Sequence, residues 1–422
     1  MRSGRKWGME EKRVAGNYGA LTILQGLNYI LPFLIIPFIV NKIELDRYGV
    51  VVTAQYFMAF CVAIVDFGFS TTATREAALL SSEGKDLSSL FNAVTYLKLF
   101  LLTAVFTVLM LVVASIPQYR TEFMVFILSY GYVVGHTLLS DWRFMGEERI
   151  KLLTTMQAVS KILYTALILI FISSPQDYLL VAGFNSLGAL LVGVVMFIIS
   201  TQGIKWQKPT FNFRNTLYKD SFQIAVSDMA GQLTYAANGI ILSLFVPSQV
   251  MGVFNVFDKF ILAAKKMFLP IYQALYPYLA RKNDAQRKAT MAKLIPSITV
   301  LGIVVTLGIF FVGPLVCDLL FTQVDFSEDY GKLQIMAIIA LFTGLNLLYV
   351  NLYAPIYKLF KSRMNIMLIG SLVNVILAFI IVPYLGLLGT VCVAVFTEFV
   401  MMLCSYWYYI RHRQPGNPQV KG

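Results

Sequence analysis

Apolar blocks of about 20 residues recur along nearly the whole chain, and only short polar segments separate them. A helix of about 20 residues rises about 30 Å, which is the thickness of the hydrocarbon core of a bilayer. Only 13% of the 422 residues are charged, about half the fraction found in an average soluble domain. A soluble chain of this length would need a charged surface that this sequence does not supply. The blocks therefore predict an all-α integral membrane protein.

The blocks predict about twelve transmembrane helices. Their approximate ranges are 17–40, 49–70, 91–114, 122–141, 154–173, 178–200, 220–246, 250–279, 294–320, 332–354, 364–383 and 386–410. A basic segment, KWQKPTFNFRNTLYK, separates two halves of similar length. We therefore expect an N-terminal six-helix lobe over 1–200, a cytoplasmic connection over 201–219 and a C-terminal six-helix lobe over 220–422. Transporters are often built from two such repeats, with the substrate path near the midplane.

Lysine and arginine are distributed very unevenly between alternate connections. One side of the predicted bilayer holds 25 of them and the other holds 4. Basic residues mark the cytoplasmic side of a membrane protein, so both termini are expected to be cytoplasmic. The net charge of +12 is spread over many connections and does not form one patch. Nucleic acid is therefore not an expected partner, and the lipid bilayer is.

Catalytic and metal-binding motifs do not emerge from the sequence. The four cysteines lie inside apolar blocks without CxxC spacing, and there are only two histidines. No P-loop, HExxH or GxSxG motif occurs. We expect no metal, no cofactor and no enzymatic activity.

Five lysines lie inside the predicted spans: Lys98, Lys161, Lys259, Lys265 and Lys266. Ionisable groups in a span are costly unless they face the interior of the bundle or a wet cavity. Lys98 and Lys161 are close enough to a cytoplasmic helix end to extend toward the headgroups, so either interpretation holds for them. Lys265 and Lys266 are about fourteen residues from that end. They are too deep for this, which indicates a cavity.

The eighth predicted helix carries a polar face in the register of an α-helix. The residues of this face are Asn255, Asp258, Leu262, Lys265, Leu269, Tyr272 and Tyr276. A contact between Asp258 and Lys265 along the same helix is the structural alternative, although two turns separate them. The mixed chemistry of this face favours a functional cavity.

Two other helices carry small or polar stripes. Gln25, Asn28 and Pro32 share a face of the first helix. Ser227, Gly231, Thr234 and Asn238 share a face of the seventh, with Asp228 beside them. Close helix packing and cavity lining explain these stripes equally well.

Four acidic residues are expected to be buried or partly buried: Asp66, Asp228, Asp258 and Glu398. A carboxyl group in a site of low dielectric constant can carry a proton, so each is a candidate for proton coupling. Each is equally a candidate structural partner of a lysine.

Several segments resemble a known family. VDFGFSTTATREAA, residues 65–78, resembles the DFGF-x-x-x-ATRE segment of that family, and FDKFILAAKKMFLPIYQALYPYLARK, residues 257–282, resembles its (D/E)K…P-I-x-Q-A-L-(Y/F)-P segment. LNYILPFLIIPFIVNKI and PYLGLLGTVCVAVFTE are similar to its first and last helices. DWRFMGEERIK, residues 141–151, departs from the aromatic-Gly-Glu loop of the family. On these motifs the chain resembles the polysaccharide transporter branch of the multidrug/oligosaccharidyl-lipid/polysaccharide exporter superfamily, and within it the Wzx-type O-antigen flippases.

The resemblance implies transport of oligosaccharide repeat units linked to undecaprenyl pyrophosphate, from the cytoplasmic to the periplasmic leaflet of a bacterial inner membrane. It implies two six-helix lobes around a central cavity that opens alternately to each side. A polysaccharide polymerase and a chain-length regulator are possible partners. The positions that match functional positions of the family are Asp66, Arg75, Glu76, Asp258, Lys259, Lys265, Gln273 and Pro277.

The expected mechanism assigns cationic groups to the diphosphate. Lys265 and Lys266, with help from Lys98 or Lys161, would hold it, after Arg75 captures it at the cytoplasmic mouth. The expected cavity and sugar contacts are Gln25, Asn28, Asn238, Tyr272 and Gln273. A drug or cation antiporter of the same superfamily is the alternative, but it would favour an acidic cavity. A membrane polymerase would usually present a large periplasmic loop, which this sequence does not contain.

Overall fold

The computed structural model describes residues 2–208 and 216–413. Side chains are described from residue 31 onward, except at 209–220, 223, 227, 228, 360 and 413. The described residues are almost entirely helical and contain no β-strand. This confirms the predicted all-α class.

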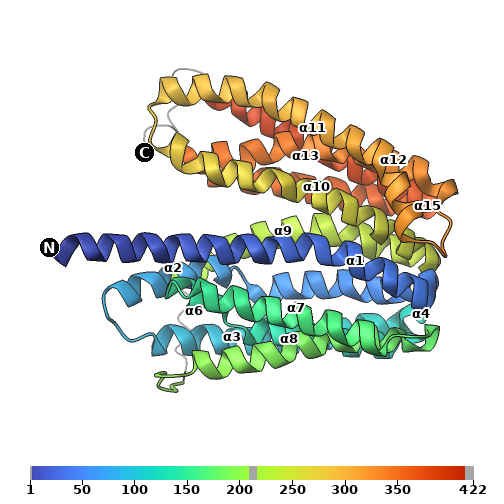
Figure 1. Cartoon of the computed structure of the whole chain (residues 1–422), viewed down its shortest axis with the longest axis horizontal. Helices are drawn as coiled ribbons and strands as arrows, with labels where there is room; N and C mark the ends of the chain where they lie inside the picture. Colours follow the sequence, from blue (N-terminus) through green and yellow to red (C-terminus); the bar gives the residue numbers. More distant parts are fainter. Residues whose placement is uncertain (1, 209–215, 414–422) are drawn as a thin grey trace. The chain divides into compact units, whose positions relative to one another are not determined.

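The chain divides into two compact units, Met1–Gln232 and Leu233–Gly422. Unit 1 contains α1 (Arg2–Asp66), α2 (Phe69–Ser82), α3 (Ser88–Ser115), α4 (Pro117–Arg120), α5 (Phe123–Leu138), α6 (Asp141–Gly146), α7 (Ile150–Phe171), η1 (Pro175–Asp177), α8 (Tyr178–Ser200) and the beginning of α9 (Thr216–Phe245). Unit 2 contains the rest of α9, α10 (Ser248–Ala280), α11 (Asp284–Leu320), η2 (Ser327–Asp329), α12 (Tyr330–Ala337), α13 (Ile339–Leu347), the π-helix η3 (Leu348–Tyr353), α14 (Ala354–Ile356) and α15 (Phe360–Arg413). Within each unit the long helices run side by side (Figure 1).

Eight helical stretches of the described chain are long and apolar enough to cross a membrane. Two of them, Leu31–Ser82 and Lys361–His412, are 52 residues long, so each would measure about 78 Å if straight. Each is interrupted by a residue with positive φ, Glu44 (69°) and Gly386 (51°), where two helices join. Each stretch is therefore long enough for two crossings. The count of twelve spans and the cytoplasmic termini stay predictions.

α10 is not among these eight stretches. It is 33 residues long, which is enough to cross a bilayer, but it carries Asp258, Lys259, Lys265 and Lys266. α10 corresponds to the eighth predicted helix. The same charged residues that distinguish this helix in the sequence also lower its hydropathy.

The two ends of unit 1 are held by different polar contacts. At one end Arg47 donates to Glu122 at 3.3 Å, and the Tyr178 hydroxyl donates to the same carboxylate at 2.9 Å. At the other end the Asn92 amide donates to the Lys205 carbonyl at 2.8 Å, and the Lys205 amide donates to Ser88 Oγ at 2.9 Å. In each of these two sets of contacts, the partners come from connections that the charge pattern assigns to the same side of the bilayer.

The start of α3 is fixed by a nearby carboxylate outside the spans. Asp86 Oδ1 accepts hydrogen bonds from the Ser88 hydroxyl and the Ser88 amide, at 2.7 and 2.9 Å. These two donors stabilise the charged form and hold the pKa of Asp86 below its ordinary value.

Small residues allow α5 and α8 to approach closely inside unit 1. A Cβ on Gly131 would lie 2.8 Å from the Ser186 Cβ, and a Cβ on Gly135 would overlap the backbone of Ala189. Ser186 Oγ also donates to the Ser129 carbonyl at 3.2 Å. Such contacts are the usual means by which helices associate in lipid, where apolar burial gives no driving force.

The break between α1 and α2 is packed against the first turns of α9. Phe67 and Gly68 both have positive φ, at 51° and 73°. A Cβ on Gly68 would lie 2.7 Å from the Ser221 carbonyl oxygen, and the Thr72 and Ser221 hydroxyls are 2.6 Å apart. The beginning of α9 therefore belongs to unit 1, whereas the sequence places the start of the second lobe at residue 220.

Unit 2 has an aromatic core built around α10 and η3. Phe268 and Tyr272 of α10 pack with Tyr349 and Tyr353 of η3, and all four side chains are buried. Tyr349 and Tyr353 stack with their ring centroids 5.3 Å apart. One face of α10 is therefore fixed inside the unit.

Candidate functional site

A buried ion pair connects the end of α1 to α3 in unit 1. Lys98 Nζ lies 2.8 Å from Asp66 Oδ1, and the side chains are only 5% and 15% exposed. The second oxygen, Asp66 Oδ2, accepts from the Ser70 amide at 3.2 Å. Both oxygens of Asp66 thus have a partner. This contact brings together two residues that the sequence analysis proposed for separate roles.

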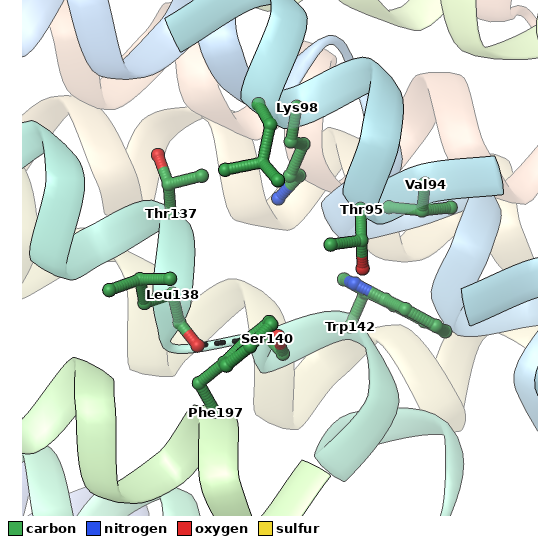
Figure 2. A pocket seen from close by; sticks show the side chains of 9 residues that line it. Val94, Thr95, Lys98, Thr137, Leu138, Ser140, Trp142 and Phe197 are labelled. Carbon is green, nitrogen blue, oxygen red and sulfur yellow. Dashed lines mark hydrogen bonds between the residues drawn. The ribbon is translucent and has the colours of Figure 1, made fainter. Parts of the chain in front are cut away.

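A small pocket lies beside Lys98, lined by Val94, Thr95, Lys98, Leu99, Thr137, Leu138, Ser140, Trp142 and Phe197. Figure 2 shows the Lys98 ammonium directed into it. The space open to the centre of a water molecule is about 10 Å³, which is room for about one water. The pocket is too small for a sugar or a diphosphate.

A second ion pair joins α10 to α15 in unit 2. Lys265 Nζ lies 2.5 Å from Glu398 Oε1. Lys265 is near the middle of α10, and Glu398 is near the middle of the part of α15 that follows Gly386. The pair therefore lies near the middle of both helices. Lys265 thus contacts Glu398, a residue on another helix. This ion pair explains the position of Lys265 without a contact to Asp258 on the same helix.

The two partners of this second pair differ in accessibility. The Lys265 side chain is 31% exposed, and the Glu398 side chain is 8% exposed. Glu398 Oε2 is buried and has no hydrogen-bond partner among the described residues. The carboxylate is thus the inner member of the pair, and the ammonium is the more accessible one.

Two further lysines of the predicted site are half-buried, Lys161 in α7 and Lys266 in α10. Neither ammonium makes an ion pair or a hydrogen bond with any residue that the structure describes. Lys259 and Asp258 are half-buried neighbours in α10. Each unit thus carries a lysine paired with a carboxylate of another helix, Lys98 in unit 1 and Lys265 in unit 2, and at least one lysine near the middle of a helix without an ion-pair partner among the described residues.

The polar stripe of α9 packs against α15. Thr234 and Ser371 hydroxyls are 3.0 Å apart, and the Asn374 amide donates to Asn238 Oδ1 at 3.0 Å. The same amide group lies 3.2 Å from Thr397 Oγ1, and Asn374 is fully buried. Helix packing therefore accounts for Thr234 and Asn238.

Tyr272 has a structural position that sequence periodicity did not predict. It is 1% exposed in the aromatic core of unit 2, and its hydroxyl donates to the Gly344 carbonyl at 2.5 Å. Its only donor is already used, which favours a structural role for Tyr272 over its predicted role as a sugar contact.

The remaining predicted positions are exposed or lie outside the description. Arg75, Glu76, Gln273 and Pro277 are exposed. The side chains of Gln25, Asn28 and Asp228 lie outside the described residues.

Asn374 and Thr397 are buried polar residues that the sequence analysis did not single out. Both lie in the last two predicted spans, and Thr397 directly precedes Glu398. An amide and a hydroxyl inside an apolar block are the signal that could have identified them.

Comparisons with known proteins agree with this architecture. Residues 14–283 match the family model described as polysaccharide biosynthesis protein. A Shigella dysenteriae protein named "Putative O-antigen transporter" is 23% identical over 385 residues, which cover 91% of this chain and 96% of that protein.

Solved structures share the fold. An inward-facing multidrug resistance transporter of the MATE family has a TM-score of 0.67 at 12% identity, covering 91% of this chain and 95% of its own. The lipid II flippase MurJ, in an inward closed conformation, has a TM-score of 0.64 at 15% identity, covering 90% of this chain and 87% of its own. Because the family model spans more than half of the sequence, the chain belongs to the polysaccharide biosynthesis protein family.

Proposed function

We propose that this protein is a flippase for oligosaccharide repeat units linked to undecaprenyl pyrophosphate. It would carry them from the cytoplasmic to the periplasmic leaflet of a bacterial inner membrane by alternating access. The similarity to a protein named as an O-antigen transporter supports the substrate class. The observation that carries the proposal is the pair of adjacent lysines at the middle of α10, of which Lys266 has no ion-pair partner among the described residues.

The substrate poses an electrostatic problem that lysines solve. Its lipid tail can stay in the bilayer, but its diphosphate would lose its hydration in hydrocarbon, at a cost of tens of kcal/mol in the ideal limit. Lysine ammonium groups at bilayer depth replace part of that hydration with charge-assisted hydrogen bonds. We assign the diphosphate chiefly to Lys266 and to the two donors of Lys265 that Glu398 does not use.

Unit 1 would contribute separately. Lys161 is half-buried and has no ion-pair partner among the described residues, so it is the stronger candidate there. Lys98 is neutralised by Asp66, whose two oxygens are both partnered, and we assign that pair to the stability of unit 1. Arg75 is exposed on α2 and remains the proposed first contact for the headgroup.

The membrane potential alone can drive this export. With the cytoplasm negative, each negative charge that moves outward gains about 2.3 kcal/mol per 100 mV. Proton coupling through Asp66, Asp228, Asp258 or Glu398 is therefore not required by the energetics. A polysaccharide polymerase and a chain-length regulator would act on the exported repeat unit.

A drug or cation antiporter is the competing function. A cationic substrate would be bound best by free carboxylates. Asp66 and Glu398 both bind lysines in this structure, and the half-buried Lys161 and Lys266 repel cations. The charge arrangement therefore favours an anionic substrate.

The test is a comparison of alanine variants in cells that depend on this protein for surface polysaccharide. Lys266→Ala should reduce surface polysaccharide without lowering the amount of protein in the membrane, and so should Lys265→Ala combined with Glu398→Gln, which leaves no buried carboxylate without its counter-ion. Lys288→Ala, which removes a surface lysine paired with Asp284 at 2.8 Å, is the matched control and should have no effect. Normal polysaccharide in the Lys265→Ala/Lys266→Ala double variant would refute the assignment.

A further inference from the structure

The ion pairs Lys98–Asp66 and Lys265–Glu398 each join two helices, and they differ in how completely the carboxylate is satisfied. Asp66 uses one oxygen for Lys98 and the other for the Ser70 amide. Glu398 uses one oxygen for Lys265, and its other oxygen is buried with no hydrogen-bond partner among the described residues. A buried carboxylate oxygen without a partner is unfavourable. Stability therefore explains the Asp66 pair better than it explains the Glu398 pair.

The two partners of the Lys265–Glu398 pair also differ in how exposed they are. The Glu398 side chain is 8% exposed and the Lys265 side chain is 31% exposed, so Lys265 is the more accessible partner and Glu398 is the deeper one. An ammonium group has three donors. With one donor on Glu398, two donors of Lys265 remain for a phosphate oxygen.

Glu398 also sets the local charge. Lys265 and Lys266 together carry two positive charges, and Glu398 reduces the sum to one. A diphosphate bound to Lys265 would lie close to Glu398, and the repulsion between them would be strong because little water screens it. Glu398 orients Lys265 and at the same time lowers the affinity of the site for an anion.

We propose that Glu398 is a positioning residue that limits how tightly the lipid diphosphate is held, so that the carrier can release it. This inference rests on the proposed function. A carrier that binds its cargo too strongly in one leaflet cannot discharge it in the other, and its turnover falls even as its affinity rises. A carboxylate that is retained to allow release, and not for stability, does not need a partner for its second oxygen. The buried Glu398 Oε2 fits this description.

The test uses the full-length protein and undecaprenyl pyrophosphate as the probe. Glu398→Gln keeps an acceptor for Lys265 and removes the charge. The variant should bind the probe about tenfold more tightly, as expected for removing a like charge a few Å away. In reconstituted vesicles its KM for flipping should fall together with its maximal rate. Glu398→Asp keeps the charge and should have an affinity close to that of the unmodified protein.

Glu122→Gln is the matched control, because it neutralises a paired glutamate at the end of unit 1 that is joined to Arg47. It should leave both affinity and rate unchanged. An unmodified protein that does not bind the probe would refute the proposed function itself. Binding in the unmodified protein with no gain in Glu398→Gln would refute only the role of Glu398.

A purely structural role has its own signature. Glu398→Met provides a second neutral variant in case Glu398→Gln does not accumulate. If neither neutral variant accumulates in the membrane while Glu122→Gln does, Glu398 is needed for folding and the inference is overturned.

Discussion

The ammonium of Lys265 and the carboxylate of Glu398 meet at 2.5 Å near the middles of two helices of unit 2, 133 positions apart in the sequence. A charge at this depth is costly unless it is paired or faces water. Lys265 satisfies the first condition, because its ammonium group contacts Glu398. The contact explains how the helix that breaks the apolar pattern of the chain can still lie inside a membrane protein.

The Asp66–Lys98 pair should be essential to the stability of unit 1. Lys98→Met would leave the Asp66 carboxylate buried without its counter-ion, and removing one partner of such a pair costs about 3–5 kcal/mol. We expect a clear loss of thermal stability in detergent for Lys98→Met. The double variant Asp66→Asn/Lys98→Met should recover part of it, and no recovery would show that the two residues are not coupled.

The contact between α5 and α8 should not tolerate an added methyl group. A Cβ on Gly135 would overlap the Ala189 backbone, whereas a Cβ on Gly183 of α8 would meet nothing within 4 Å. Overpacking of this kind costs roughly 1–3 kcal/mol. Gly135→Ala should therefore lower the melting temperature, and Gly183→Ala should not. Equal melting temperatures for the two variants would contradict the packing described here.

Tyr272 should affect stability and not transport specificity. Tyr272→Phe removes one of the two donors to the Gly344 carbonyl, which still accepts from the Leu348 amide, at a cost of about 0.5–1.5 kcal/mol. The control is Tyr276→Phe, because Tyr276 is 40% exposed. Melting temperature should fall only in Tyr272→Phe, and its KM for flipping should stay unchanged. A raised KM in a fully folded Tyr272→Phe protein would restore its predicted role as a sugar contact.

Flipping should respond to the membrane potential more than to the pH gradient. Two negative charges moving outward gain about 4.6 kcal/mol per 100 mV, which is twice the value for one charge. Collapsing the pH gradient in vesicles at constant potential should therefore leave the rate of flipping unchanged. A rate that falls to background would establish obligatory proton coupling through one of the acidic residues.

The all-α membrane class could be predicted from the sequence because hydrocarbon imposes a simple rule. Segments that cross it must be apolar and about 20 residues long, and the exceptions, such as Lys265 and Lys266 in α10, are conspicuous. Lysine and arginine counts predict the side of the bilayer that each connection faces, and this assignment stays a prediction. Arg47 and Glu122 at one end of unit 1, and Ser88 and Lys205 at the other, meet as this pattern predicts.

The partners of the buried charges could not be predicted in the same way. Periodicity shows which residues share a face of a helix, but it does not show which helix lies opposite. Asp258 was the partner available to Lys265 on its own helix, while Glu398 is on another helix. Tyr272 shares the face of Lys265, yet it packs in an aromatic core, because a residue two turns away along a helix meets a different neighbour.

Binding of lipid diphosphate to the purified protein tests the central claim most directly. Undecaprenyl pyrophosphate and a cationic dye would be titrated against the full-length protein and Lys266→Ala in lipid nanodiscs. We predict that the protein binds the diphosphate and not the dye, and that Lys266→Ala weakens diphosphate binding at least about tenfold, the loss expected for one close charge pair. Tight binding of the dye, or diphosphate binding that is unchanged in Lys266→Ala, would contradict the account.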